Sequence, residues 1–181
     1  MIRRTIPQKT ISNEVELNGV GLHSGQKVNI KFKPAPVDTG LVFIREDLLE
    51  DNMIDANIKY ISNTDRGTNI DNGTVRIQTS EHVLAALVGL GIDNCFISLN
   101  GPEVPIMDGS SKDFIQVLET AEIKEQSILR EEFFPDSPIT FKDEESGGEI
   151  SLVPYENYSL DTTVDYGTKV LGIQKASIDD I

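Results

Sequence analysis

Residues 80–91 read SEHVLAALVGLG, a helical apolar period that two glycines weaken and then end. The apolar residues on one face of the expected helix are Val83, Leu84, Leu87 and Leu90. A stripe of this width is typical of a helix that covers one face of a sheet. We therefore expect a helix here, with Glu81 and His82 adjacent in its first turn.

The surrounding residues have the two-residue period of half-buried strands. In residues 26–32, Val28, Ile30 and Phe32 alternate with polar residues. Similar patterns occupy residues 39–47, 74–78 and 94–100, and Asn72-Gly73 is a hairpin signal. Residues 108–123 contain a second helical stripe of apolar residues. The pattern predicts an α+β fold, a two-layer sandwich of a mixed or antiparallel sheet packed with two helices.

The character of the chain changes at residues 124–138, which are charged and contain prolines. Only strand-like segments follow, at residues 138–144, 149–154 and 158–166. Without a following amphipathic helix, these strands leave one sheet face uncovered. We expect an N-terminal α+β domain at residues 1–127 and, at residues 128–181, a second unit that is the incomplete beginning of another α+β domain or needs help from another chain.

Composition excludes several classes of function. The net charge of −14 over 181 residues opposes nucleic-acid binding, which depends on Lys and Arg side chains near phosphates. No apolar run approaches the roughly 20 residues of a membrane span, and residues 1–10 lack the apolar segment of a signal peptide. We therefore expect a cytoplasmic location. Cys95 shares a strand face with Ile97 and Leu99, which favours a buried structural thiol.

The pair Glu81 and His82 has two interpretations. The positive end of a helix macrodipole favours an ionised carboxylate and a neutral imidazole, the form that binds a metal. A hydrolase can divide the work between a metal-binding imidazole and a carboxylate that deprotonates water. Glu in a first turn is also common without any catalytic role, and there is no HExxH motif, Cys pair or nucleophile elbow. These two residues alone leave both interpretations open.

Two further residues are weaker candidates. His23 lies in GVGLHSG, residues 19–25, a probable turn in which a loop histidine is more common than a ligand. Asp108 lies in a loop before the second helix, where capping is its default role.

Four motifs in the same order resemble the zinc-dependent UDP-3-O-acyl-N-acetylglucosamine deacetylase family of lipid A biosynthesis. They are GVGLHSG (19–25), FKPAPVDTG (32–40), TSEHVLAALVGLGIDN (79–94) and PEVPIMDGSSKDF (102–114). The resemblance implies two similar α+β domains with the active site between them. It also implies a Gram-negative source and removal of the N-acetyl group from a UDP-sugar that carries a 3-O-acyl chain.

The resemblance assigns roles to six residues of this chain. His82 matches a zinc ligand of the family, and Glu81 matches the general base that activates water. His23, Arg66, Asp108 and Tyr166 match positions that lie near or contact the substrate.

One departure from the family pattern limits these expectations. The family completes its zinc site with an HKxxD motif and uses a later histidine as general acid, but no histidine follows His82. We expect an N-terminal portion of such an enzyme, inactive alone, whose missing residues come from the rest of the chain. In some relatives a hydroxyacyl dehydratase is fused downstream. The alternative is a non-catalytic sugar-nucleotide-binding or assembly module that needs a partner chain.

Overall fold

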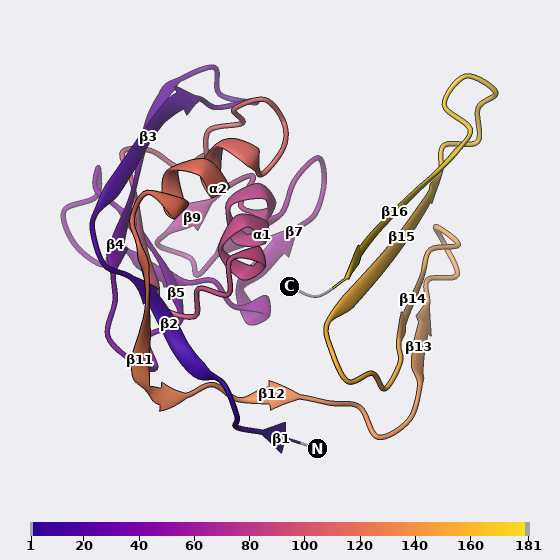
Figure 1. Cartoon of the computed structure of the whole chain (residues 1–181). Coiled ribbons are helices and arrows are strands. Elements are labelled where there is room, and N and C mark those ends of the chain that lie inside the picture. The colour runs from indigo at the N-terminus through magenta and orange to yellow at the C-terminus, as the bar shows by residue number, and fades with distance from the viewer. Residues whose placement is uncertain (1, 180–181) are drawn as a thin grey trace. The chain divides into compact units, whose positions relative to one another are not determined.

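The computed structural model describes residues 2–179, and a mixed five-stranded sheet lies at the centre of its larger part (Figure 1). In spatial order the strands are β3 (Val15–Val20), β4 (Lys27–Pro34), β10 (Cys95–Leu99), β5 (Leu41–Arg45) and β6 (Met53–Asp55). β10 runs antiparallel to β4 and parallel to β5, while the other neighbours pair antiparallel. The parallel step is possible because β6 to β9 and α1 lie between β5 and β10 in the sequence.

Two helices, α1 (Glu81–Gly89) and α2 (Lys112–Glu119), pack side by side against one face of this sheet (Figure 1). A single row of side chains crosses all five strands in register: Val15, Phe32, Ile97, Phe43 and Ile54. These residues join the helix residues Val83, Leu87, Phe114 and Leu118 in one hydrophobic cluster. Burial of each large side chain stabilises the fold by roughly 1.5–3 kcal/mol, so this cluster holds α1 and α2 against the sheet.

Two smaller groups of strands flank the central sheet. β2 (Pro7–Ile11) pairs antiparallel with β11 (Ile123–Leu129), which places Ile11 opposite Ile123. β7 (Ile61–Asn63), β8 (Asn69–Asp71) and β9 (Arg76–Ile77) form a three-stranded sheet that follows a short 3₁₀ helix, η1 (Ile58–Tyr60). The residues between β7 and β8 reach the start of α1.

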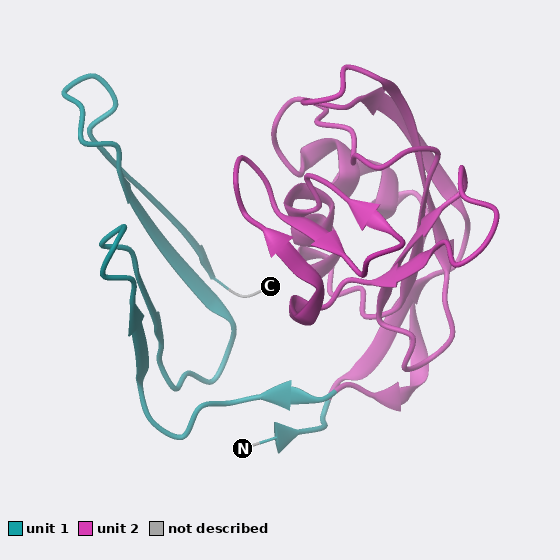
Figure 2. Cartoon of the chain, turned by 180° about the vertical axis from the view of Figure 1, so that it is seen from behind, with its two compact units in different colours: residues 1–5, 131–181 teal, residues 6–130 magenta. Residues whose placement is uncertain are grey.

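The chain separates into two compact units, residues 6–130 and residues 2–5 together with 131–179 (Figure 2). In the second unit, β1 (Ile2–Arg3) pairs with β12 (Glu132–Phe133). Two hairpins follow, β13 (Ile139–Lys142) with β14 (Glu149–Leu152) and β15 (Ser159–Asp165) with β16 (Ile173–Asp179). The prediction that residues 128–181 begin a second, similar domain stays a prediction, and residues 180 and 181 lie outside the described part.

The α+β class, the two helices and the main strands predicted from the sequence are confirmed. Asn72 and Gly73 lie in the turn between β8 and β9, as the hairpin signal indicated. The strands that were not predicted are β1, β2, β3, β6, β7, β11, β12 and β16. Cys95 is fully buried, which confirms the predicted burial of its thiol, and burial raises the pKa of that thiol to about 12. Across residues 2–179, no helix has the length and apolar character needed to cross a membrane.

Candidate functional site

Glu81 and His82 are the first two residues of α1, and both side chains are partly exposed. His82 Nε2 lies 3.8 Å from Glu81 Oε1, so the imidazole and the carboxylate face a common region. The sequence placed both residues in the first turn of this helix, and the structure confirms that position. Their proposed chemical roles are a separate matter.

A loop between β7 and β8 holds the carboxylate of Glu81. The backbone N–H of Thr68 donates to Glu81 Oε2 at 2.8 Å. In return, the Thr68 carbonyl accepts from the backbone N–H of Ser80 at 3.1 Å and from the Ser80 hydroxyl at 2.9 Å. The hydroxyl of Ser80 therefore binds this loop instead of capping its own helix. These three bonds attach the loop to the first turn of α1 and leave Oε1 as the carboxylate oxygen nearer to His82.

Two residues near Glu81, Thr79 before α1 and Gly67 in the loop between β7 and β8, have positive φ angles. Thr79, which is buried, has a φ of 58°, a value rare for a β-branched residue. Such backbone strain amounts to about 1–3 kcal/mol and is often found at functional sites. Gly67 has a φ of 154°, and a Cβ on it would lie 3.4 Å from Glu81 Oε1. The lack of a side chain at Gly67 thus keeps space beside that oxygen.

His23 contacts the same loop from the turn that follows β3. His23 Nε2 lies 3.1 Å from the carbonyl oxygen of Arg66. Because a carbonyl oxygen only accepts, the Nε2 atom must carry the hydrogen and donate it. Arg66 has a φ of 59° and is exposed, and it meets His23 through its backbone rather than its guanidinium group. The structure therefore brings together four of the sequence-predicted residues: Glu81, His82, His23 and Arg66.

Glu103 is a residue of this region that sequence reasoning missed. Its carboxylate accepts from the backbone N–H of His23 at 2.7 Å and from that of Ser24 at 2.9 Å. The residue is 1% exposed. Burial by itself would raise the pKa of Glu103, but the N–H groups of His23 and Ser24 and the Ser24 hydroxyl outweigh it and hold the pKa below its usual value. The only local signal was a single charged residue between Pro102 and the apolar Val104.

The expected capping role of Asp108 is wrong, because its carboxylate accepts from Ser110, which precedes Lys112, the first residue of α2. Its Oδ1 accepts from the backbone N–H of Ser110 at 2.9 Å and from the Ser110 hydroxyl at 2.7 Å. The Ser110 hydroxyl, followed by its N–H, holds the pKa of this exposed carboxyl below its usual value. Three residues on, the Ser111 hydroxyl donates to the His82 carbonyl at 2.9 Å and joins the starts of the two helices. Asp108 thus shapes the loop beside α1.

Tyr166 belongs to the other compact unit, in the turn between β15 and β16. Its backbone N–H donates to the Gly172 carbonyl at 3.2 Å, and its side chain is about half exposed. This contact closes the turn of the hairpin. It carries no information about a substrate.

The described residues supply only part of a metal site. Catalytic zinc sites use three protein ligands and one open position. Within residues 2–179, no three His, Cys, Asp or Glu side chains converge as such a set. His82 offers one imidazole nitrogen and Glu81 one neighbouring carboxylate, so the donors present do not complete a zinc site by themselves.

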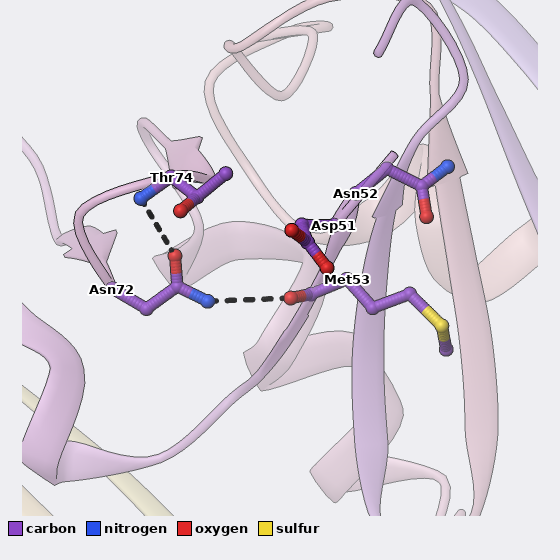
Figure 3. Close-up of a pocket in the computed structure, with 5 residues that line it drawn as sticks. All are labelled: Asp51, Asn52, Met53, Asn72 and Thr74. Atoms are coloured by element: carbon purple, nitrogen blue, oxygen red, sulfur yellow. Dashed lines mark hydrogen bonds between the residues drawn. The ribbon is translucent and has the colours of Figure 1, made fainter. Parts of the chain in front are cut away.

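A shallow depression elsewhere on this unit has a volume of about 480 Å³ (Figure 3). It is lined by Asp51, Asn52, Met53, Asn72 and Thr74. Asn72 spans it, since its Nδ2 donates to the Met53 carbonyl at 3.3 Å and its Oδ1 accepts from the Thr74 N–H at 3.1 Å. None of the sequence-predicted site residues lines it, so it is separate from the candidate site.

Known proteins resemble this chain over most of its length. Residues 8–180 match the family LpxC, described as UDP-3-O-acyl N-acetylglycosamine deacetylase. A bifunctional enzyme LpxC/FabZ of Chlorobaculum tepidum is 43% identical over 176 residues, which cover 97% of this chain and 38% of that protein. Its name describes a second activity, in line with the fusions expected for some relatives.

Two relatives carry the deacetylase name alone. A UDP-3-O-acyl-N-acetylglucosamine deacetylase of Acidithiobacillus ferrooxidans is 39% identical over 176 residues, or 96% of this chain and 57% of that protein. One of Legionella pneumophila is 41% identical over 161 residues, or 89% of this chain and 52% of that protein. The chain thus spans between 38% and 57% of the length of these relatives. Since the family match extends over residues 8–180, the chain belongs to the UDP-3-O-acyl N-acetylglycosamine deacetylase family.

Proposed function

We propose that this chain contributes to the active site of a zinc-dependent deacetylase that acts in the cytoplasm of a Gram-negative bacterium. The substrate is UDP-3-O-acyl-N-acetylglucosamine, and hydrolysis of its N-acetyl group gives a free amine and acetate on the route to lipid A. The observation that carries the proposal is the pair Glu81 and His82, 3.8 Å apart at the start of α1, in a chain that matches this family. The proposal includes residues outside these 181, and we call the longer protein the full-length enzyme.

In this proposal Glu81 is the general base. Its Oε2 already accepts the Thr68 N–H, so Oε1 is the oxygen that takes a proton from the attacking water. The space kept by Gly67 lies beside that oxygen. A positioned general base contributes typically 10²- to 10⁴-fold to a rate.

Zinc dependence is part of the proposal, with His82 as one ligand and the others from outside this chain. In this proposal His23, Arg66, Asp108 and Tyr166 contact the substrate. Because the donors among the described residues are incomplete, we expect the 181 residues alone to bind zinc weakly and to release no measurable acetate.

The test compares Glu81→Gln with Glu119→Gln in the full-length enzyme, with acetate release from the UDP-sugar as the assay. Glu119 is an exposed glutamate at the end of α2, so its variant controls for the loss of one charge. We expect Glu81→Gln to lower kcat by about 100-fold or more and Glu119→Gln to leave it unchanged. His82→Ala should also lower the zinc content. Retention of more than half of wild-type turnover by Glu81→Gln would refute the proposal.

The incomplete donor set also favours a second candidate, a non-catalytic sugar-nucleotide-binding or assembly module that needs a partner chain. Mixing these 181 residues with the remaining part of the Acidithiobacillus ferrooxidans relative separates the two. Restored acetate release supports the deacetylase, whereas UDP-sugar binding with no activity supports the module.

A further inference from the structure

The segment of residues 102–106 connects two parts of the candidate site. On one side it pairs with the end of β3, where Gly21 bridges to Pro105 and the Ile106 N–H donates to the Val20 carbonyl at 3.0 Å. On the other side it pairs with Gln78, which donates to the Pro102 carbonyl at 2.7 Å and accepts the Val104 N–H at 3.0 Å. The segment therefore lies between the His23 turn and the residues that lead into α1.

Glu103 is at the middle of this segment, and its carboxylate fills the His23 turn. Each carboxylate oxygen accepts one backbone N–H, from His23 and from Ser24. A Cβ on Gly21 would collide with this carboxylate, so the glycine is needed for the close approach. A Gln side chain would be a poor substitute, because its NH₂ group would face one of the two N–H donors.

The His23 turn connects Glu103 to Glu81, the general base of the proposed reaction. His23 donates to the Arg66 carbonyl at 3.1 Å. Two residues later, the Thr68 N–H holds Glu81 Oε2 at 2.8 Å. Three consecutive residues, Arg66 to Thr68, thus connect the imidazole of His23 to the carboxylate of Glu81.

We propose that Glu103 is a positioning residue for Glu81, acting through the His23 turn and the Arg66–Thr68 loop. The proposal rests on the role of Glu81 as general base given above. Glu103 does not touch the reacting atoms in this account. It sets the direction of the Glu81 carboxylate, and a displacement of about 1 Å in such a group can lower a rate by about 100-fold.

The first test needs no activity and uses NMR of the chain itself. The chain has two histidines, so the His23 and His82 imidazole signals can be assigned with two variants. We expect His23 to carry its hydrogen on Nε2, and we expect Glu103→Gln to remove this preference. The Thr68 amide signal should move towards its position in Glu81→Ala, which serves as the reference for a lost bond. Glu119→Gln should leave both signals in place.

The second test measures kcat and KM of Glu103→Gln in the full-length enzyme. We expect kcat to fall by about 10- to 100-fold and KM to rise by a smaller factor, because His23 and Arg66, which contact the substrate in the proposed function, belong to the displaced turn and loop. If Glu103→Gln fails to fold, Glu103→Asp replaces it in the test. Asp keeps the charge but is one methylene shorter, so kcat should fall by a smaller factor. Gly21→Ala should mimic the defect, whereas Gly89→Ala, which meets nothing within 4 Å, should not.

The outcomes separate this inference from the proposed function. Unchanged His23 and Thr68 signals in Glu103→Gln overturn the inference, and so does unchanged kcat in an enzyme that Glu81→Gln inactivates. If Glu81→Gln itself leaves turnover unchanged, the proposed function fails. In that case the NMR signals still decide whether Glu103 positions the Glu81 carboxylate.

Discussion

The unit of residues 6–130 and the unit of residues 2–5 and 131–179 (Figure 2) both contain antiparallel strand pairs, but their side chains differ in burial. The first unit contains every fully buried apolar side chain among residues 2–179. In the second, the described residues are exposed or partly exposed throughout. The strands of both units have their backbone hydrogen bonds, so strand pairing alone does not explain the difference.

The apolar pattern of the second unit resembles that of the first. In the hairpin β13–β14, Ile139 lies opposite Leu152 and Phe141 opposite Ile150, which gives one apolar face. Phe141 and Ile150 are nevertheless 68% and 69% exposed. The central sheet has α1 and α2 as a second layer, and a two-stranded hairpin without such a layer is at best marginally stable in water. Alternation therefore predicts a strand, whereas burial depends on a second element.

Truncation of one phenylalanine in each unit should show the largest difference. Phe43 in β5 is fully buried, and Phe43→Ala should lower the free energy of unfolding by about 3–5 kcal/mol. Phe141→Ala should change it by no more than about 0.5 kcal/mol, because most of that ring already faces solvent. Urea unfolding followed by circular dichroism measures both values. A decrease of more than about 2 kcal/mol in the free energy of unfolding of Phe141→Ala would contradict the difference in burial between the two units.

Local periodicity predicted the parts of the fold that local sequence determines. The stripe of Val83, Leu84, Leu87 and Leu90 predicted α1, and the alternation of Val28, Ile30 and Phe32 predicted β4. The pairing of β2 with β11 joins Ile11 to Ile123 and was missed, since no local pattern specifies a partner more than a hundred residues away. The same holds for the pairing of β1 with β12.

The candidate site was partly predictable for similar reasons. Glu81 and His82 could be placed in the first turn because the helix start has a local signature. The contact of His23 with the Arg66 carbonyl and the bonds to Glu103 join residues 43 and about 80 positions apart. One partner in each contact is a backbone carbonyl or N–H group, and because the backbone is the same at every residue, the sequence could not reveal which residue supplies it.

The two units should also differ, by a smaller amount, in how one carboxyl group makes their stability depend on pH. Burial opposes ionisation of Glu103, but two N–H donors keep its pKa below the unfolded value of about 4.3. A lowered pKa adds stability above the unfolded value, and this stability is lost as the pH falls through the folded value. The difference in urea midpoint between wild type and Glu103→Gln should therefore be largest near pH 7 and shrink below about pH 4.

Asp143 in the turn after β13 supplies the control from the other unit. The Ser146 hydroxyl, with the N–H groups of Glu145 and Ser146, also holds the pKa of this carboxyl below its usual value. Since Asp143 is exposed and belongs to the unit without a core, Asp143→Asn should leave the midpoint unchanged at every pH. A difference for Glu103→Gln that stays constant from pH 7 to pH 3 would contradict the role of its charge.

Two glycine substitutions should give the smallest effects, with opposite signs. Gly89 ends α1, is exposed, and has open space where a Cβ would go, so Gly89→Ala should stabilise the first unit by about 0.5 kcal/mol. Gly147 has a φ of 71° in the turn between β13 and β14, where a side chain adds strain of about 1–2 kcal/mol. Gly147→Ala should speed amide hydrogen exchange in that hairpin and leave the urea midpoint of the first unit unchanged. A shift of that midpoint would mean that the hairpin and the first unit unfold cooperatively. If the hairpin unfolds independently, strain in its turn cannot change the stability of the hydrophobic core that packs against α1.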